Sequence, residues 1–324
     1  MTVRSPGERA PLLIGLDLGG SKIEAAALRR AADGSLEIAV RKRIPTERDR
    51  GYESVLERSA SLLIEVTREV GADPREAPIG VGMPGGVTRA GLVKNSNTVI
   101  LNGRPFREDL CRALGRPVAF ENDANCFALA EARMGAGAAA PFGRGVVFGV
   151  ILGTGVGGGL VIGGSAWTGA QGIAGEWGHH AVWPDRGPVC YCGRRGCLEL
   201  FASGTGVERD YRERAGASLK LAEIARRREE DPHAGGAIES LLETFGRGLA
   251  NVIDILDPSA IVLGGGVSNL DFLYTEGVAR VARYVFNDEL TTPILKNALG
   301  DSSGVLGAAL LNEPGLGEVS ARSA

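Results

Sequence analysis

The segment PLLIGLDLGGSKIEAAAL (residues 11–28) decides the fold of the first half of the chain. Apolar residues lie on both sides of two adjacent glycines, a pattern typical of a strand, a tight turn and a returning antiparallel strand. The alternating segment 35–44 adds a third strand, residues 51–70 have apolar side chains at helical spacing, and the apolar run 79–84 predicts a buried strand. Three strands, a helix and a further strand predict a mixed sheet in an α/β domain.

The same pattern occurs again later in the chain. The segment FGVILGT (148–154) matches IGLDLGG (14–20), with Gly153 in the place of Gly19, and both segments continue into apolar returning strands. Chance can produce such a match in a chain with 49 glycines. We favour duplication of one strand–turn–strand unit, which predicts a second α/β domain.

Helical and apolar patterns extend this organisation to the end of the chain. Helices are expected from about 105, from 124, and near 203–214, 218–229, 236–256, 271–286 and 303–312, with strands at 117–121 and 261–264. The expected domains are residues 11–122 together with 303–312, and residues 123–302. The segments 1–10 and 313–324 lack such patterns and are expected to be disordered tails.

The composition of the chain is that of a globular protein of the cytoplasm. Its 324 residues are 44% hydrophobic and 23% charged, and the formal net charge of -3 gives no reason to expect a nucleic-acid or membrane partner. Every apolar run is shorter than the ~18 residues that a membrane span requires, and the N-terminus has no apolar signal core. The five cysteines are expected to stay reduced in the cytoplasm.

Three glycine-rich runs follow apolar strands and are candidates for phosphate binding. Backbone N–H groups at such turns can converge on a phosphate because no Cβ blocks the approach. The first run adds a carboxylate that suits a Mg²⁺–water shell, a hydroxyl and an ammonium group. The predicted nucleotide-binding residues are Asp17, Gly19, Gly20, Ser21 and Lys22, then Gly153, Thr154 and Gly155, and then Gly264, Gly265 and Gly266. A tight turn alone explains each run, but together the three favour a nucleotide held between two lobes.

Asp123 lies where a predicted strand ends and a predicted helix begins, in the segment FENDAN (120–125). Phosphoryl transfer needs a positioned acceptor hydroxyl and a group that accepts its proton, typically one Asp. Asp is also a good helix N-cap at such a boundary, so both roles stay open. The neighbouring Asn122 can donate and accept hydrogen bonds, as recognition of a sugar hydroxyl requires.

A cluster of potential metal ligands follows the second glycine run. Cys190, Cys192 and Cys197 offer three thiolates, and His179 lies upstream of them, with His180 as the rival ligand. Three cysteines and one histidine form a closed tetrahedral zinc set, which leaves no position for a reacting water, so a structural Zn²⁺ is expected. A metal-bound histidine uses only one of its two ring nitrogens for the metal. Its second ring nitrogen stays available for a substrate.

Two carboxylates flank this cluster, Glu176 before it and Glu199 directly after it. Both can be solvated surface charges. A zinc loop that fixes their backbone would equally suit two carboxylates that bind sugar hydroxyls.

These motifs together identify a family resemblance. The chain resembles the ROK family of bacterial sugar kinases from about residue 11 to 312, in the motifs DLGGSK (17–22), ENDAN (121–125), LGTGVGGG (152–159), GIAGEWGH (172–179), CYCGRRGCLE (190–199) and LGGGV (263–267). The resemblance implies an actin-like, ribonuclease-H-like fold of two α/β domains, with ATP and sugar in the cleft between them.

The resemblance also implies roles for single residues. Asp123 is similar in position to the catalytic base of the family. The implied sugar ligands are Asn122, Asp123, Glu176, His179 and Glu199, and the implied zinc ligands are His179, Cys190, Cys192 and Cys197.

Within the family, several segments are most similar to the mannofructokinase-like members, followed by the N-acetylglucosamine kinases. These segments are LNGRPF (101–106), CFALAE (126–131) and SGTG (203–206), and they imply that Asn102 contacts the sugar. The segment HAVWPD (180–185) departs from these relatives, which have Asn and a Pro-rich stretch after the motif histidine. Since this shortened loop borders the sugar site, the departure bears on which sugar is accepted.

The resulting prediction is a Mg²⁺-dependent ATP:hexose 6-phosphotransferase that acts on fructose, mannose or glucose, with N-acetylglucosamine as the alternative acceptor. A homodimer is implied by the resemblance, because relatives are commonly dimers.

A sugar sensor without catalysis is the main rival function, and the intact DLGGSK motif and Asp123 argue against it. The mixed charges of ARRREED (225–231) indicate a solvated helix face rather than a nucleic-acid site. A family repressor would carry a helix-turn-helix module ahead of the first strand, where about ten residues lie.

Overall fold

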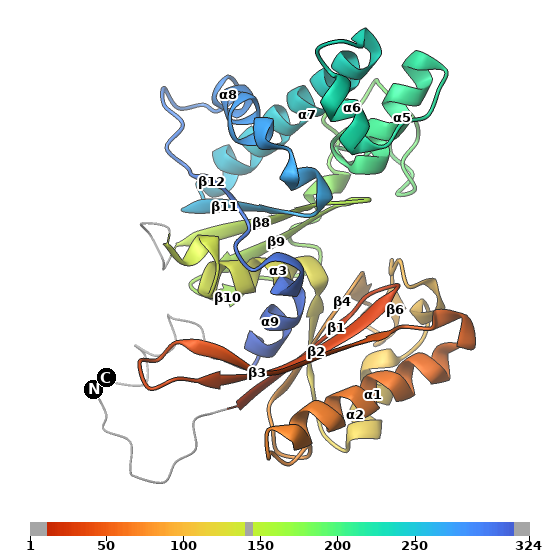
Figure 1. Cartoon of the computed structure of the whole chain (residues 1–324), viewed down its shortest axis with the longest axis vertical. Coiled ribbons are helices and arrows are strands. Elements are labelled where there is room, and N and C mark those ends of the chain that lie inside the picture. The colour runs from red at the N-terminus through yellow and green to blue at the C-terminus, as the bar shows by residue number, and fades with distance from the viewer. Residues whose placement is uncertain (1–11, 140–144, 314–324) are drawn as a thin grey trace. The chain divides into compact units, whose positions relative to one another are not determined.

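The computed structural model describes residues 12–139 and 145–313. The expected tails are 1–10 and 313–324, and except for Glu313 they lie outside the described residues. The chain divides into two compact units (Figure 1): unit 1 is the described part of Met1–Ala130 and of Asp301–Ala324, and unit 2 is that of Glu131–Gly300.

The first chain crossing between the units differs from the expected boundary at residues 122 and 123. Helix α3 (Asp123–Arg133) begins in unit 1, and its first turns pack there. A Cβ on Gly82 would lie 3.0 Å from Sγ of Cys126, and one on Gly307 would overlap the Cys126 backbone. This close packing explains why the boundary falls within the helix.

The sheet of unit 1 has three antiparallel strands followed by two parallel ones, as the mixed-sheet prediction required. The strand order is β3-β2-β1-β4-β7, with β2 antiparallel to β1 and β3, and with β4 and β7 parallel to β1. The strands are β1 (Leu12–Leu18), β2 (Lys22–Arg30), β3 (Leu36–Pro45), β4 (Ile79–Met83) and β7 (Ala119–Asn122), and a separate pair is formed by β5 (Gly86–Val87) and β6 (Val93–Lys94).

Helices cover both faces of this sheet. Figure 1 shows α1 (Tyr52–Glu69) and α2 (Phe106–Leu114) on one face and α9 (Ser303–Leu310) on the other. A Cβ on Gly15 or on Gly80 would overlap the backbone of α9. Glycine on β1 and β4 therefore allows a close approach of the helix to the sheet.

The sheet of unit 2 repeats the arrangement of the first, with order β10-β9-β8-β11-β12. Its strands are β8 (Val146–Leu152), β9 (Val156–Ile162), β10 (Ser165–Ala166), β11 (Ala260–Gly264) and β12 (Ile294–Lys296). Strand β8 matches β1 residue for residue at the spacing seen in the sequence. The predicted repeat is confirmed as two mixed sheets with one strand order.

Five α-helices lie on one face of the unit 2 sheet (Figure 1): α4 (Glu199–Ala202), α5 (Gly204–Ala215), α6 (Leu221–Arg227), α7 (Pro232–Leu256) and α8 (Glu276–Ala282). Helix α7 begins before the expected residue 236, because Asp231 caps it. The Asp231 carboxylate accepts hydrogen bonds from the N–H groups of His233 and Ala234, and Pro232 occupies the first helical position.

Short 3-10 helices connect many of these elements. They are Arg48–Arg50, Val99–Leu101, Ala136–Ala139, Trp177–His179, Gly266–Asn269, Asp271–Tyr274 and Gly300–Ser302. The helix expected over 271–286 is instead the turn Asp271–Tyr274 followed by α8, which ends at Ala282.

A buried carboxylate ties together the two ends of unit 2. Oε2 of Glu131 accepts hydrogen bonds from the N–H groups of Ala136 and Ala298, and Oε1 accepts one from Leu299, each at 3.0 Å. Glu131 has no solvent exposure. A single side chain therefore holds the segment that enters unit 2 and the segment that leaves it.

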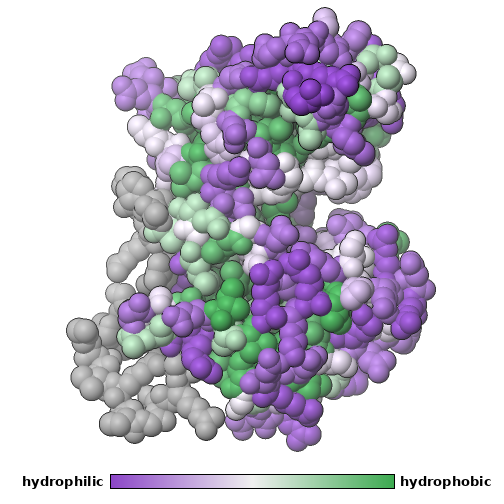
Figure 2. Space-filling model, in the orientation of Figure 1, coloured by the Kyte–Doolittle hydropathy of each residue, from purple (hydrophilic) through white to green (hydrophobic). Residues whose placement is uncertain are grey.

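The surface over α5 and α6 is strongly hydrophilic (Figure 2). Glu223 pairs with Arg226 and Arg227 at 2.6 and 2.5 Å, and Arg228 pairs with Glu276 at 2.6 Å. Each arginine of residues 226–228 is thus paired with a carboxylate. In the described ranges 12–139 and 145–313, every helix is too short or too polar to cross a membrane.

Candidate active site

The glycine turn of unit 1 is held by hydrogen bonds from the end of β3. Within the turn, the N–H of Gly19 donates to the carbonyl of Lys22 at 2.9 Å. The hydroxyl of Thr46 donates to the carbonyl of Gly19 at 2.7 Å, and its N–H donates to the carbonyl of Ser21 at 3.0 Å. These bonds fix the turn in the absence of any side chain on Gly19 and Gly20.

Asp17 lies beside this turn at the end of β1, next to other carboxylates. Its cross-strand partner is Glu24, which is fully buried and accepts hydrogen bonds from Arg41 at 2.5 Å and Arg43 at 2.8 Å. Burial, followed by the charges of Asp123 and Glu24, raises the pKa of Asp17 to about 7. A cation near Asp17 would relieve this repulsion, so the residue suits the predicted Mg²⁺–water shell.

Asn122 and Asp123 occupy the junction between β7 and α3. The amide of Asn122 donates to the carbonyl of Gly85 at 2.9 Å, and its Oδ1 accepts from the N–H of Ala124 at 2.9 Å. Oδ1 of Asp123 also accepts from Ala124 at 2.9 Å. Asn122 thus shares the role of helix cap, and the charge of Asp123 contributes to the raised pKa of Asp17.

Two neighbours of this junction were missed from the sequence. Oε1 of Glu121 accepts hydrogen bonds from the N–H of Asn122 at 2.8 Å and from the amide of Asn125 at 3.0 Å. Burial raises the pKa of Glu121. Glu121 lies on β7 and Asn125 in the first turn of α3, so their contact depends on the strand–helix junction, and no helical spacing signals it in the sequence.

The amide of Asn102 is engaged on both sides by the backbone of one residue. Its Oδ1 accepts from the N–H of Ser96 at 2.9 Å, and its Nδ2 donates to the carbonyl of Ser96 at 3.0 Å. A Cβ on Gly85 would lie 2.7 Å from the same Ser96 nitrogen. Asn102 therefore closes a loop that packs against Gly85, the partner of Asn122, and its contact with a sugar stays a prediction.

The two glycine runs of unit 2 lie together at the ends of neighbouring parallel strands. β8 leads into Gly153–Gly155 and β11 into Gly264–Gly266, and a Cβ on Gly265 would lie 3.0 Å from the nitrogen of Gly153. Gly153 also accepts a hydrogen bond from the N–H of Gly204, at the start of α5, at 2.8 Å. The N–H of Gly153 donates to the carbonyl of Gly155 at 2.9 Å, so backbone hydrogen bonds hold this turn beside the N-terminus of α5, and its contact with a phosphate stays a prediction.

Glu199 contacts the first of these runs. Its Oε2 accepts a hydrogen bond from the N–H of Val156 at 3.0 Å, and a Cβ on Gly155 would lie 2.6 Å from the same oxygen. Thr154 is held by a hydrogen bond from the Thr205 hydroxyl to its carbonyl at 2.6 Å. The carboxylate predicted as a sugar ligand thus touches the predicted nucleotide turn.

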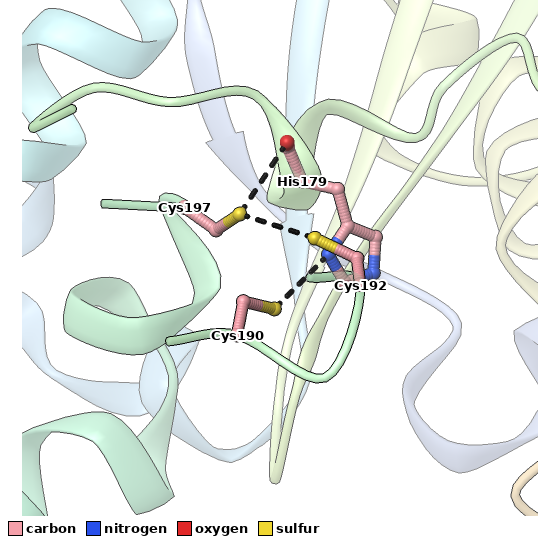
Figure 3. Close-up of side chains that lie close together, drawn as sticks. All are labelled: His179, Cys190, Cys192 and Cys197. Carbon is pink, nitrogen blue, oxygen red and sulfur yellow. Dashed lines mark hydrogen bonds between the residues drawn. The ribbon is translucent and has the colours of Figure 1, made fainter. Parts of the chain in front are cut away.

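His179 and the three cysteines gather into one cluster (Figure 3), in which all four potential ligand atoms lie within 4.8 Å of one another. Nδ1 of His179 lies 3.6 Å from Sγ of Cys190, and the sulfurs of Cys192 and Cys197 lie 3.5 Å apart. Tetrahedral coordination with bonds of about 2.0 to 2.3 Å places ligand atoms roughly 3.5 to 3.8 Å apart. The donor set and its spacing fit a Zn²⁺ ion.

His180, the rival ligand, points elsewhere. Its Nδ1 lies 2.6 Å from the carbonyl of Trp177, and its Nε2 lies 3.4 Å from the amide of Asn251 on α7. Of the two adjacent histidines, only His179 belongs to the cluster.

Tyr191, between the first two cysteines, was also missed from the sequence. Its hydroxyl lies 2.7 Å from Nε2 of His179, and the two rings meet edge to face with centroids 4.9 Å apart. Desolvation, followed by the charges of Glu199 and Glu176, raises the pKa of Tyr191 to about 12. Tyr191 thus contacts His179 directly and feels the charges of both carboxylates.

The predicted residues thus form one set in each unit. Unit 1 brings together a fixed glycine turn, the carboxylates of Asp17 and Asp123, and the amide of Asn122. Unit 2 brings together two glycine runs, with the carboxylate of Glu199 against the first of them, and a thiol–imidazole cluster beside Tyr191. Such groups can bind phosphates, bind hydroxyls and accept a proton.

Comparison with known proteins gives one consistent family. The model of the ROK family matches residues 13–314. N-acetyl-D-glucosamine kinases of Mannheimia succiniciproducens and Vibrio vulnificus are each 37% identical to the chain, over 93% of its length and 99% of theirs.

Solved structures agree with this comparison. The ROK hexokinase from Thermus thermophilus is 34% identical with a TM-score of 0.82, over 96% of this chain and 99% of that chain. A ROK family glucokinase from Streptomyces griseus, solved in complex with glucose and AMPPNP, is 29% identical with a TM-score of 0.70, over 93% of this chain and 98% of that chain. The actin-like fold expected from the resemblance is confirmed.

Proposed function

The chain belongs to the ROK family and is a sugar kinase, and on this premise we propose that it transfers the terminal phosphate of ATP to the 6-hydroxyl of N-acetyl-D-glucosamine. The observation that carries the proposal is the junction of β7 and α3, where Asp123 lies near a second carboxylate and Asn122. Kinases need such a carboxylate to accept the proton of the hydroxyl. The cytoplasm, where the protein is expected to lie, supplies the ATP that this reaction needs.

The proposed mechanism assigns the proton to Asp123. As the 6-oxygen attacks the terminal phosphorus, the bond from that phosphorus to the bridging oxygen breaks, and Asp123 accepts the hydroxyl proton. Asn122, Glu176, His179 and Glu199 are proposed to bind and orient the sugar. The glycine runs are proposed to bind the phosphates of ATP through backbone N–H groups.

Mg²⁺, when bound, offsets the negative charge of the phosphates, and Asp17 is the residue proposed to orient its water shell. The raised pKa of Asp17 supports this assignment, because a carboxylate among other carboxylates gains most from a cation.

We also propose that His179, Cys190, Cys192 and Cys197 hold a structural Zn²⁺. Four protein ligands saturate a tetrahedral ion, so it has no position for a reacting group. Its effect is to fix the loop on which Tyr191 lies and from which Glu199 begins α4.

The choice of acceptor rests on the relatives. The two curated relatives at 37% identity are named N-acetyl-D-glucosamine kinases, and this favours the alternative over the expected fructose and mannose. Glucose is the second candidate, since the ROK hexokinase is 34% identical and the solved glucokinase binds glucose.

A coupled assay of ADP release tests the proposal. Purified protein with ATP and Mg²⁺ is assayed against N-acetyl-D-glucosamine, glucose, mannose and fructose, and the product is identified by NMR as the 6-phosphate. We expect the highest kcat/KM with N-acetyl-D-glucosamine. A higher kcat/KM with glucose would show that glucose, the second candidate, is the preferred acceptor. The absence of ADP release with every sugar would reject the kinase proposal.

A further inference from the structure

The segment that follows β3 is built onto the glycine turn of unit 1. Thr46 has no solvent exposure, and its hydroxyl and N–H bind the carbonyls of Gly19 and Ser21, as described above. The next residue, Glu47, adopts a left-handed conformation with φ of 50°. Few residues other than glycine take this conformation, and here it turns the chain into the 3-10 helix that begins at Arg48.

The carboxylate of Glu47 is occupied by other arginines. Arg50 lies 3.0 Å and Arg58 lies 3.2 Å from its Oε2. Over residues 12–139 and 145–313, by contrast, the guanidinium of Arg48 has neither a hydrogen bond nor an ion pair. Arg48 therefore has no paired carboxylate among the described residues, and the preceding Glu47 already contacts two other arginines.

The guanidinium of Arg48 lies at the open side of Gly20. A Cβ on Gly20 would lie 3.5 Å from Nη1 of Arg48, 3.7 Å from the hydroxyl of Thr98 and 3.8 Å from Oδ1 of Asn97. Thr98 is fully buried, so this hydroxyl is fixed in place. The missing side chain of Gly20 leaves a position lined by a cation, a hydroxyl and an amide.

The lysine of the same turn does not occupy this position. Nζ of Lys22 lies 3.8 Å from Oε2 of Glu24, on the strand that leaves the turn. Lys22 is thus paired with a buried carboxylate, and Arg48 supplies the unpaired positive charge beside Gly20.

We propose that Arg48 binds the phosphoryl group that is transferred, at the position next to Gly20. This inference rests on the proposed kinase function and adds a residue to it. The guanidinium stays protonated and donates two parallel hydrogen bonds to phosphate oxygens, which an arginine does better than a lysine. It offsets negative charge on the phosphoryl oxygens while Asp123 accepts the proton of the hydroxyl.

The variants Arg48→Gln and Arg48→Lys test the proposal, with Arg50→Gln as the matched control in the same 3-10 helix. We expect Arg48→Gln to lower kcat/KM for ATP about 10- to 100-fold, the range for loss of hydrogen bonds to a charged group, with the Kd of the sugar unchanged. Arg48→Lys should recover part of the loss. The kcat/KM of Arg50→Gln should stay within about 2-fold of the wild-type value, since this variant removes only an exposed ion pair with Glu47.

A binding measurement separates this inference from the kinase proposal. Calorimetry with inorganic tripolyphosphate and Mg²⁺ measures phosphate affinity without catalysis, and we expect Arg48→Gln to bind about 10-fold or more weakly than Arg50→Gln. Equal affinity and equal kcat/KM of the two variants would overturn the role of Arg48 in an active enzyme. If the wild type released no ADP with any sugar, the kinase proposal would fail, and the tripolyphosphate comparison would still decide whether Arg48 binds phosphate. Thermal unfolding of each variant confirms that it is folded.

Discussion

The hydroxyl of Tyr191 lies 2.7 Å from Nε2 of His179, the ring nitrogen that faces away from the cysteine cluster. A sugar that used His179 as a ligand would have to replace this hydrogen bond. The tyrosine is 75% exposed, so it can move aside at little packing cost. The Tyr191 hydroxyl therefore competes with a sugar hydroxyl for the same ring nitrogen of His179.

Tyr191→Phe is expected to lower the KM for the sugar. The variant removes the competing hydroxyl and keeps the ring against His179, and a net hydrogen bond of about 0.5 to 1.5 kcal/mol corresponds to a decrease of roughly 2- to 10-fold. Steady-state kinetics with saturating ATP measure the change. An increase in KM would show instead that the hydroxyl binds the sugar directly.

Asp123→Asn is expected to lower kcat by about 10²- to 10⁴-fold, the range for loss of a general base. Sugar affinity, measured by calorimetry, should change little, because the amide keeps the shape and hydrogen-bonding capacity of the side chain. Asp73→Asn, in an exposed turn after α1, is the control and should retain full turnover. Near-normal turnover of Asp123→Asn would exclude Asp123 as the base.

Elemental analysis of the purified protein is expected to find about one zinc per chain. Cys192→Ser should reduce the zinc content and lower the midpoint of thermal unfolding, because metal binding contributes to the stability of the folded loop. Cys111→Ser, outside the cluster, should change neither. A Cys192→Ser protein with full zinc content would rule out the proposed ligand set.

The contribution of Asp17 to the stability of the protein is expected to decrease as the pH rises from about 4 to 7. Its pKa is about 7 in the folded protein, against the model-peptide value of 3.8, so the folded state binds the extra proton in this range. Deprotonation therefore costs more in the folded than in the unfolded chain. Asp17→Asn should be less dependent on pH between these values, as measured by urea unfolding without Mg²⁺ or nucleotide. If the free energy of unfolding of the wild type and of the variant changed with pH in parallel, the raised pKa of Asp17 would be contradicted.

Glu131→Gln is expected to lower the free energy of unfolding by about 1 to 3 kcal/mol. The amide replaces one acceptor oxygen with a donor, and at least one of the three N–H groups bound by Glu131 is left without a partner in a buried position. Urea unfolding measures the change, with the exposed Glu289→Gln as the control. An unchanged free energy would show that water or backbone relaxation replaces the lost bond.

The fold could be predicted where the sequence pattern is local and periodic. The apolar strands that flank Gly19 and Gly153 gave the position of β1 and β8 and the repeat of the sheet order. Strand β12 was missed because its three residues are too short for any periodicity. The start of α7 was placed late because the capping by Asp231 was not recognised.

The site was predictable in residue type but not in contacts. The Cys spacing predicted a metal cluster but did not distinguish His179 from His180. The family resemblance implied His179, and the folded chain brings that residue into the cluster. Tyr191 and Arg48 carry no motif of their own. Each becomes important through a partner that is distant in sequence, His179 for the first and Gly20 for the second.

Helix α9 has a consequence for how the chain matures on the ribosome. It covers β1 and β4, and Gly15 and Gly80 leave no gap beneath it, yet it is translated after the whole of unit 2. The sheet that emerges first therefore lacks α9 over β1 and β4 until synthesis has passed residue 310, whereas the elements of unit 2 are all made before that point. Newly made chains are thus most exposed to chaperones and proteases at the strands made first.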